Sequence, residues 1–145
     1  MIERARSYHI QGIGTVINVC NQVLRDFRDG TSVRLCLLSA EEDEVLGVCN
    51  YTSIVRGTFQ SCHLGYALAK KYQSKGIMFE ALQLTNRYVF EELGLHRIVA
   101  GYLPHNARSG QLLKKLGFEK EGYARQYLKI NGRWEDHILT SLINV

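Results

Sequence analysis

The sequence lacks the long apolar run that a membrane-spanning helix needs, because no stretch approaches the required length of roughly 18–20 residues. Its opening segment, "MIERARSYHI", carries charges that no apolar segment follows, so it does not look like a secretory signal. Repeats, low-complexity tracts and linkers are also missing. A chain of 145 residues suits one domain over 1–145, and we expect it to be cytoplasmic.

Metal-binding and nucleotide-binding motifs are missing as well. The four cysteines, Cys20, Cys36, Cys49 and Cys62, form no C-x-x-C pair, and three of them fall in expected strands. We expect them to be reduced and to pack as small apolar side chains, and the alternatives are a metal site or a disulfide. The histidines have no ligand spacing, so we predict no metal. Neither G-x-x-x-x-G-K-[ST] nor G-x-G-x-x-G occurs, which argues against a nucleotide-binding loop or a dinucleotide fold.

What the chain does contain is the composition of a folded protein, 46% hydrophobic and 22% charged, with a net charge of +4. This charge is too weak to indicate nucleic-acid binding, but it favours an anionic ligand or a ribosomal neighbourhood. Apolar periodicity and turn residues predict the elements. They are a helix over 13–27, strands over 32–38, 45–54 and 60–68, a helix over 76–92, a strand over 96–103, a helix over 106–118, and two strands joined at Asn131-Gly132.

These elements predict an α/β fold with a mixed sheet. Short turns join the first three strands, which is typical of an antiparallel meander, whereas the strand after the long helix must be a crossover partner. Asn131-Gly132 is a type I′ turn signal. Gly117 is expected to end its helix in a left-handed conformation, with Phe118 folding back onto the last turn.

The stretch "KKYQSKGIMFEALQL", Lys70–Leu84, begins its helix at a glycine. No Ser, Thr, Asp or Asn stands immediately before Gly76 as an N-cap. The free N–H groups and the helix dipole favour a phosphate, Gly76 allows close approach, and Lys75 adds charge. A helix start that is simply hydrated is the alternative.

Two longer stretches resemble a known family. "LGYALAKKYQSKGIMFEA" resembles the coenzyme A pyrophosphate loop of the Gcn5-related N-acetyltransferase (GNAT) superfamily, whose pattern is Gln/Arg-x-x-Gly-x-Gly/Ala. Gln73, Gly76 and Met78 occupy these positions, and Met78 departs from the usual small residue. "PHNARSGQLLKKLGFEKEGYARQYLKINGRWEDH" is similar to the RimJ/RimL-type ribosomal-protein N-acetyltransferases, nearest the RimJ branch, which also shares "GVCNYTSIVRG". The resemblance runs from about Asp26 to the end of the chain.

The resemblance implies a GNAT fold, a mixed and mostly antiparallel sheet flanked by helices. It also implies transfer of acetyl from acetyl-CoA to the N-terminal amine of an alanine on a ribosomal protein, by resemblance small-subunit ribosomal protein five. The family fold begins with a strand and two helices before its second strand. Only about thirty residues precede Ser32, so we expect the first strand, part of the first helix, or both to be absent or remodelled.

The same resemblance assigns residues to the cofactor. Backbone groups on the third strand would pair with the pantetheine arm as an added strand would, and the loop amides would bind the pyrophosphate. Asn106 matches a position that contacts the cofactor arm, and it is also a good N-cap. The expected cofactor-binding residues are Tyr66, Ala67, Leu68, Gln73, Ser74, Lys75, Gly76, Ile77, Met78, Phe79 and Asn106.

The proton donor is less clearly marked. Many superfamily members carry a tyrosine seven residues after this asparagine, but Leu113 stands there. Ser109 matches a serine that is proposed as the general acid in the RimL-like pattern. The alternative is a serine that only bonds to its own helix turn.

No general base is assigned. An α-amino group has a pKa of about 7.7–8.0, so roughly a tenth is already neutral at pH 7 and a water chain suffices. His105, Asp136 and His137 are candidates, although structural roles are the commoner explanation for such residues. Two other functions stay open: acetylation of a small amine such as a polyamine or antibiotic, and ribosome assembly with only the fold retained. Against the latter, basic patches interleaved with aromatics are missing.

Overall fold

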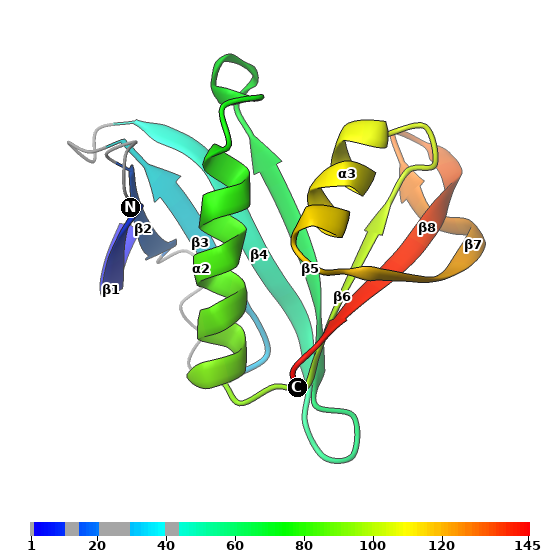
Figure 1. Cartoon of the computed structure of the whole chain (residues 1–145), viewed down its shortest axis with the longest axis horizontal. Helices are drawn as coiled ribbons and strands as arrows, with labels where there is room; N and C mark the ends of the chain where they lie inside the picture. Colours follow the sequence, from blue (N-terminus) through cyan, green and yellow to red (C-terminus); the bar gives the residue numbers. More distant parts are fainter. Residues whose placement is uncertain (1, 11–14, 21–29, 40–43) are drawn as a thin grey trace.

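The structure, a computed structural model, describes residues 2–10, 15–20, 30–39 and 44–145, with side chains in the last two ranges. In these residues one eight-stranded sheet carries α2 and α3 (Figure 1). The elements are β1 (Ile2–Ile10), β2 (Thr15–Cys20), β3 (Val33–Leu38), β4 (Val45–Val55), β5 (Ser61–Leu68), the 3-10 helix η2 (Lys70–Tyr72), α2 (Ile77–Glu91), β6 (Arg97–Tyr102), α3 (Ala107–Lys115), β7 (Glu119–Ile130) and β8 (Arg133–Ile143).

The strand order is β1-β2-β3-β4-β5-β6-β8-β7, and β5 and β6 are the one parallel pair among these strands. The predicted meander over β3, β4 and β5 is confirmed, as is the crossover through α2 to β6. A parallel neighbour cannot be reached by a tight turn, so the chain returns along α2 before it adds β6. The expected mixed, mostly antiparallel sheet flanked by helices is therefore confirmed.

The predicted helix over 13–27 is wrong where the structure describes it. Residues Thr15–Cys20 form β2, which pairs antiparallel with both β1 and β3, and the rest of 13–27 lies outside the described residues. The segment "TVINV" is rich in β-branched residues, which fit a strand better than a helix. The N-terminal part was expected to lack or remodel the first strand, part of the first helix, or both. Two strands, β1 and β2, precede β3 in the described residues.

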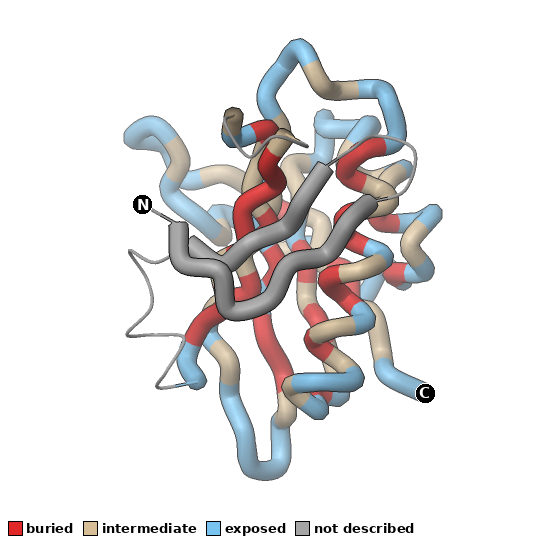
Figure 2. Tube along the Cα trace, turned by 90° about the vertical axis from the view of Figure 1, so that its left-hand side faces the viewer, coloured by how far each residue is buried: buried red, intermediate tan, exposed pale blue. Residues whose placement is uncertain are grey.

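The core lies between α2 and the sheet. Buried side chains of α2, among them Ile77, Ala81, Leu82 and Val89, pack against apolar residues of β3 to β6 in one cluster, which Leu113 of α3 joins. Figure 2 shows the buried positions along the central strands and α2, and exposed positions at the loops. This packing holds both helices against the strands that form the candidate site.

Local predictions from turn and cap residues are confirmed. Asn131 and Gly132 have φ values of 51° and 79° between β7 and β8, which is the left-handed backbone that a type I′ turn requires. Gly117 has φ of 96°, and the Phe118 N–H bonds to the Leu113 carbonyl at 3.0 Å. Phe118 is buried, so it folds back onto the helix as expected.

The cysteines depart from expectation at one position. Cys49 and Cys62 are free and buried in the strands where they were predicted. Burial raises the pKa of both thiols to about 12, which keeps them neutral and unreactive. Cys36 is disulfide-bonded, so the expectation that it is reduced is wrong. No spacing motif in the sequence marks this disulfide. Whether a disulfide can form depends on which residues the fold brings close together.

Candidate active site

The candidate site lies where β5 and β6 part. Their pairing covers Ser61 to His63 on β5 and Arg97 to Val99 on β6, and both strands continue beyond it. A cavity of about 730 Å³ occupies this region. Its walls are Leu64, Gly65, Tyr66, Ala67, Leu68, Gln73, Ser74, Gly76, Ile77, Met78, Phe79, Gly101, Tyr102, Leu103, Asn106, Arg108, Ser109, Gln111, Leu112, Lys115 and His137.

One wall is the edge of β5. Residues from Leu64 to Leu68 remain paired with β4 on one side, while their pairing with β6 has ended on the other. Gly47 of β4 permits this close packing, since a Cβ there would lie 2.4 Å from the Ala67 carbonyl oxygen. Backbone N–H and C=O groups on the parted side of β5 are therefore placed to pair with an extended ligand.

A second wall is the loop that leads into α2. Gly76 is the N-cap of α2 with φ of 77°, and no side chain among the described residues caps this helix. The N–H groups of the first turn have no intrahelical acceptor, so they are available to a ligand or to water. Ser74 also has positive φ, at 64°, and both residues line the cavity. Their amides and the helix dipole favour an anion here.

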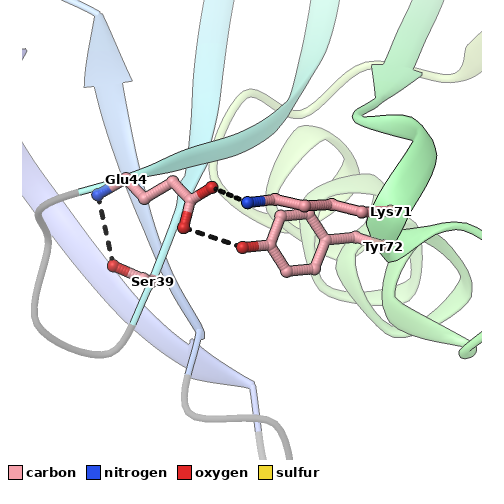
Figure 3. Close-up of polar contacts among 4 residues, drawn as sticks. All are labelled: Ser39, Glu44, Lys71 and Tyr72. Atoms are coloured by element: carbon pink, nitrogen blue, oxygen red, sulfur yellow. Dashed lines mark hydrogen bonds and ion pairs between the residues drawn. The ribbon is translucent and has the colours of Figure 1, made fainter.

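The loop is attached to the β3–β4 turn by Glu44 (Figure 3). One carboxylate oxygen lies 2.7 Å from Lys71 Nζ, and the other accepts a 2.7 Å hydrogen bond from the Tyr72 hydroxyl. The Lys71 ammonium, followed by the Tyr72 hydroxyl, lowers the pKa of Glu44 below its ordinary 4.5. Ser39 Oγ accepts from the Glu44 N–H, which completes the attachment.

Gln73 connects the loop to both β5 and α3. Its amide nitrogen donates to the Leu68 carbonyl at 3.0 Å, and its amide oxygen accepts from the Arg108 guanidinium. Arg108 and Lys115 both belong to α3 and line the cavity. The described cavity wall includes no aspartate or glutamate. Electrostatics in the cavity therefore favour an anionic ligand.

The first turn of α3 supplies a polar pair. The Asn106 side chain caps the helix by accepting the Ser109 N–H at 3.2 Å, so its predicted N-cap role is confirmed. This cap presents Ser109 to β5, where its hydroxyl shares a hydrogen bond with the Tyr66 hydroxyl. Burial is the main cause that raises the pKa of Tyr66 above its ordinary 10.0, and the bond to Ser109 opposes it. The Tyr66 phenol thus stays protonated at neutral pH.

The three candidate bases are not equivalent. His137 is buried in the cavity wall, and its Nδ1 lies 3.0 Å from the Glu135 carbonyl oxygen. A carbonyl only accepts, so Nδ1 carries the proton in that bond. Asp136 instead accepts from the Tyr123 hydroxyl at 2.6 Å and from the Gln126 N–H at 2.8 Å, outside the cavity. His105 is exposed and does not line the cavity either.

The structure brings the expected site residues together around one cavity, with one exception. Of the twelve cofactor-binding and catalytic residues expected from the sequence, only Lys75 does not line the cavity. Sequence reasoning missed Arg108, Lys115 and Tyr102, which do. The sequence did contain a signal for Arg108, because this residue lies between the cap Asn106 and Ser109 on the same helical turn.

The comparison with family models decides the family. Residues 10–119 match the model described as "Acetyltransferase (GNAT) domain". The chain belongs to the GNAT acetyltransferase family. Enzymes of this family use acetyl-CoA, and a GNAT domain accounts for the parted strands and the loop before α2.

Three relatives are particularly similar to this GNAT chain. Ribosomal protein uS5-alanine N-acetyltransferase of Escherichia coli (strain K12) is 50% identical over 115 residues, which are 79% of this chain and 59% of that protein. The crystal structure of ribosomal-protein-S5-alanine acetyltransferase from Vibrio fischeri has a TM-score of 0.82 and 42% identity, over 86% of this chain and 68% of that one. Mycobacterium smegmatis RimJ in complex with CoA-disulfide has a TM-score of 0.79 and 28% identity, over 86% of this chain and 58% of that one.

The chain thus spans about three fifths of the length of the Escherichia coli relative. Within the described residues, no helix is both long and apolar enough to cross a membrane. The same residues hold no group of three or more His, Cys, Asp or Glu side chains that could bind a metal ion.

Proposed function

We propose that this protein transfers acetyl from acetyl-CoA to the N-terminal amine of a ribosomal protein, with alanine as the first residue. The observation that carries this proposal is the cavity between the parted ends of β5 and β6, which offers a strand edge and an uncapped helix start together. The names of the Escherichia coli and Vibrio fischeri relatives support ribosomal protein S5 as the acceptor. We place the reaction in the cytoplasm, in one catalytic domain.

The first task in the reaction is to hold acetyl-CoA. The free edge of Tyr66, Ala67 and Leu68 would pair with the amides of the pantetheine arm, and one N–H there would polarise the thioester carbonyl. The pyrophosphate would lie against the amides of 74–79, with Gln73 and Asn106 orienting the arm. The absence of carboxylates from the described cavity wall supports the binding of a pyrophosphate in this cavity, since the pyrophosphate is anionic.

Lys75 and Arg108 have different parts in this scheme. Lys75 lies outside the cavity wall, so its proposed part is limited to positive charge near the loop. Arg108 provides the side-chain charge, since it lines the cavity and already contacts the loop through Gln73. A guanidinium suits this task because its planar donors match phosphate oxygens.

The second task is to bring a neutral amine to the thioester. An N-terminal peptide segment would enter between the parted strands in extended form, and a small pocket would read its first side chain. At pH 7 roughly a tenth of α-amino groups are neutral, whereas a lysine amine of pKa about 10.4 is almost wholly charged. The third task is to protonate the leaving thiolate, which we assign to Ser109.

An acceptor comparison tests this proposal. Initial rates would be measured with three acceptors: a peptide beginning with alanine, the same peptide blocked at its N-terminus but carrying an internal lysine, and spermidine. We expect the alanine peptide to have the highest kcat/KM. A tenfold advantage for spermidine or an aminoglycoside would replace the ribosomal acceptor with a small amine. Coenzyme A binding without turnover of any amine would favour a ribosome-assembly factor that only retains the fold.

A further inference from the structure

If Ser109 protonates the leaving thiolate, its own proton must be replaced. A serine hydroxyl is a far weaker acid than a phenol, whose ordinary pKa is about 10. Ser109 cannot therefore give up its proton to a departing thiolate and wait as an alkoxide. It needs a neighbour that replaces the proton in the same step.

The Tyr66 hydroxyl is the neighbour in contact. It comes from β5, 43 residues away in sequence, and bonds to the Ser109 hydroxyl within the cavity wall. Tyr66 also faces Cys49 across the β4–β5 ladder, and Cys49 is kept neutral by burial. Leu113 occupies the position where many relatives carry a tyrosine donor, and it is buried in the core. A phenol from a different element therefore stands beside the serine.

We infer that Tyr66 supplies the proton that Ser109 passes to the coenzyme A thiolate, an inference that rests on the acetyltransferase function proposed above. Ser109 touches the reacting sulfur, whereas Tyr66 acts through Ser109 and positions its hydroxyl. The Asn106 cap on the Ser109 N–H holds the serine at this place on the helix. Two hydroxyls from two elements thus replace the single tyrosine donor.

The step balances in atoms and electrons. The amine nitrogen attacks the thioester carbon, and when the carbon–sulfur bond breaks its electron pair remains on sulfur. Sulfur takes the Ser109 proton, Ser109 takes the Tyr66 proton, and a phenolate remains at Tyr66. The proton that the amine nitrogen loses on becoming an amide returns through water to the phenolate. Free coenzyme A and the acetylated amine leave, and both hydroxyls are restored.

Kinetics of Tyr66→Phe, Ser109→Ala and the double variant test the inference. Tyr66→Phe removes only the hydroxyl, and we expect kcat to fall about 10²-fold, near the lower range for a lost general acid. The KM for acetyl-CoA should stay within about twofold of the original, because binding is unchanged in this variant. The kcat of the double variant should lie within about threefold of the kcat of Ser109→Ala, as expected for two groups that act as a unit.

A pH profile separates proton supply from a structural role. Activity should fall at alkaline pH as Tyr66 loses its proton, and replacement by a fluorinated tyrosine, a stronger acid, should move this fall to lower pH. The other titratable groups around the pair are Cys49, whose pKa is about 12, and Tyr102, His137, Arg108 and Lys115 in the cavity wall. Tyr66→Phe leaves all five in place, so only a fall caused by Tyr66 itself should disappear.

The matched control is Tyr123→Phe, which also removes a bonded tyrosine hydroxyl but lies outside the cavity wall. Its kcat should stay within about twofold of the original. Unchanged kcat in Tyr66→Phe, additive losses in the double variant, or an unmoved alkaline limb with fluorotyrosine would each overturn the inference while leaving the acetyltransferase activity intact. Failure of the unaltered protein to acetylate any amine would overturn the proposed function, and this inference with it.

Discussion

The Tyr72 hydroxyl donates a 2.7 Å hydrogen bond to Glu44 Oε2, and this bond joins the turn before β4 to the 3-10 helix η2 (Figure 3). Lys71 contacts the other carboxylate oxygen at 2.7 Å. Glu44 thus holds two consecutive residues of the segment that leads into Gln73 and the proposed pyrophosphate loop. The contact limits the positions available to this loop before any ligand arrives.

We expect Glu44→Gln to weaken coenzyme A binding about two- to fivefold, in keeping with the modest strength of exposed ion pairs. The glutamine can still accept from Tyr72 but loses the ion pair with Lys71. Calorimetry at low and high salt would measure the effect, which should shrink in high salt. Glu91→Gln, at the exposed far end of α2, is the control and should bind as the original does. Equal affinity of both variants at low salt would refute the loop-holding role.

Gly76 and Gly94 form a matched pair at the two ends of α2. Their φ values are 77° and 68°, and a Cβ at either position would meet nothing within 4 Å. Valine at either site should lower the free energy of unfolding by about 1–3 kcal/mol, because left-handed backbone strains a β-branched residue. Urea denaturation would measure this loss.

Coenzyme A affinity should distinguish the two glycine variants. Gly76 lines the cavity and Gly94 does not, so only Gly76→Val should reduce affinity beyond what its lost stability explains. Equal affinities for the two folded proteins, measured by calorimetry, would remove the pyrophosphate from the α2 start.

Arg108→Ala should weaken coenzyme A binding about tenfold, which corresponds to one charge-assisted contact. The dependence of affinity on salt should also decrease, because a cation is lost from the cavity. The affinity of Arg108→Lys for coenzyme A should lie between that of the original protein and that of Arg108→Ala, since a lysine keeps the charge without the planar donors. Lys114→Ala is the control, because Lys114 is exposed on the same helix but outside the cavity wall. If both alanine variants bind equally well, Arg108 contributes neither directly nor through Gln73 to coenzyme A binding.

Asp136 should contribute to stability in a pH-dependent way. It holds the irregular part of β7 by accepting from Tyr123 and from the N–H of Gln126, which has φ of 47°. The Tyr123 hydroxyl, followed by the Gln126 N–H, lowers the pKa of Asp136 below its ordinary 3.8. A lowered carboxyl pKa stabilises the folded state above the ordinary value, and this contribution is lost as the pH falls through the lowered pKa.

The melting temperature of the protein should therefore decrease more steeply below about pH 4 than that of Asp136→Asn, which cannot lose a charge. Above that pH the variant should be the less stable of the two. Thermal denaturation between neutral and acidic pH would measure both curves. Parallel curves over the whole range would show that this carboxylate does not contribute through its ionisation.

Several features of this protein were determined by its sequence alone. The turn at Asn131-Gly132, the helix end at Gly117 and the uncapped start of α2 at Gly76 were all predicted correctly. Each depends on backbone angles or capping groups within a few residues, and glycine and asparagine adopt the required left-handed angles at little cost. The meander and the crossover helix followed from periodicity and connection length.

Other features were decided only by the tertiary structure. Apolar periodicity predicted a helix over 13–27, but pairing with β1 and β3 makes Thr15–Cys20 a strand. The parting of β5 and β6, the Arg108–Gln73 contact and the Tyr66–Ser109 pair are likewise tertiary. These contacts join residues 35 and 43 positions apart, so they depend on how α3 packs against the strands rather than on local preference. Sequence motifs located the residues of the candidate site, and the packing of α3 decided which of them meet.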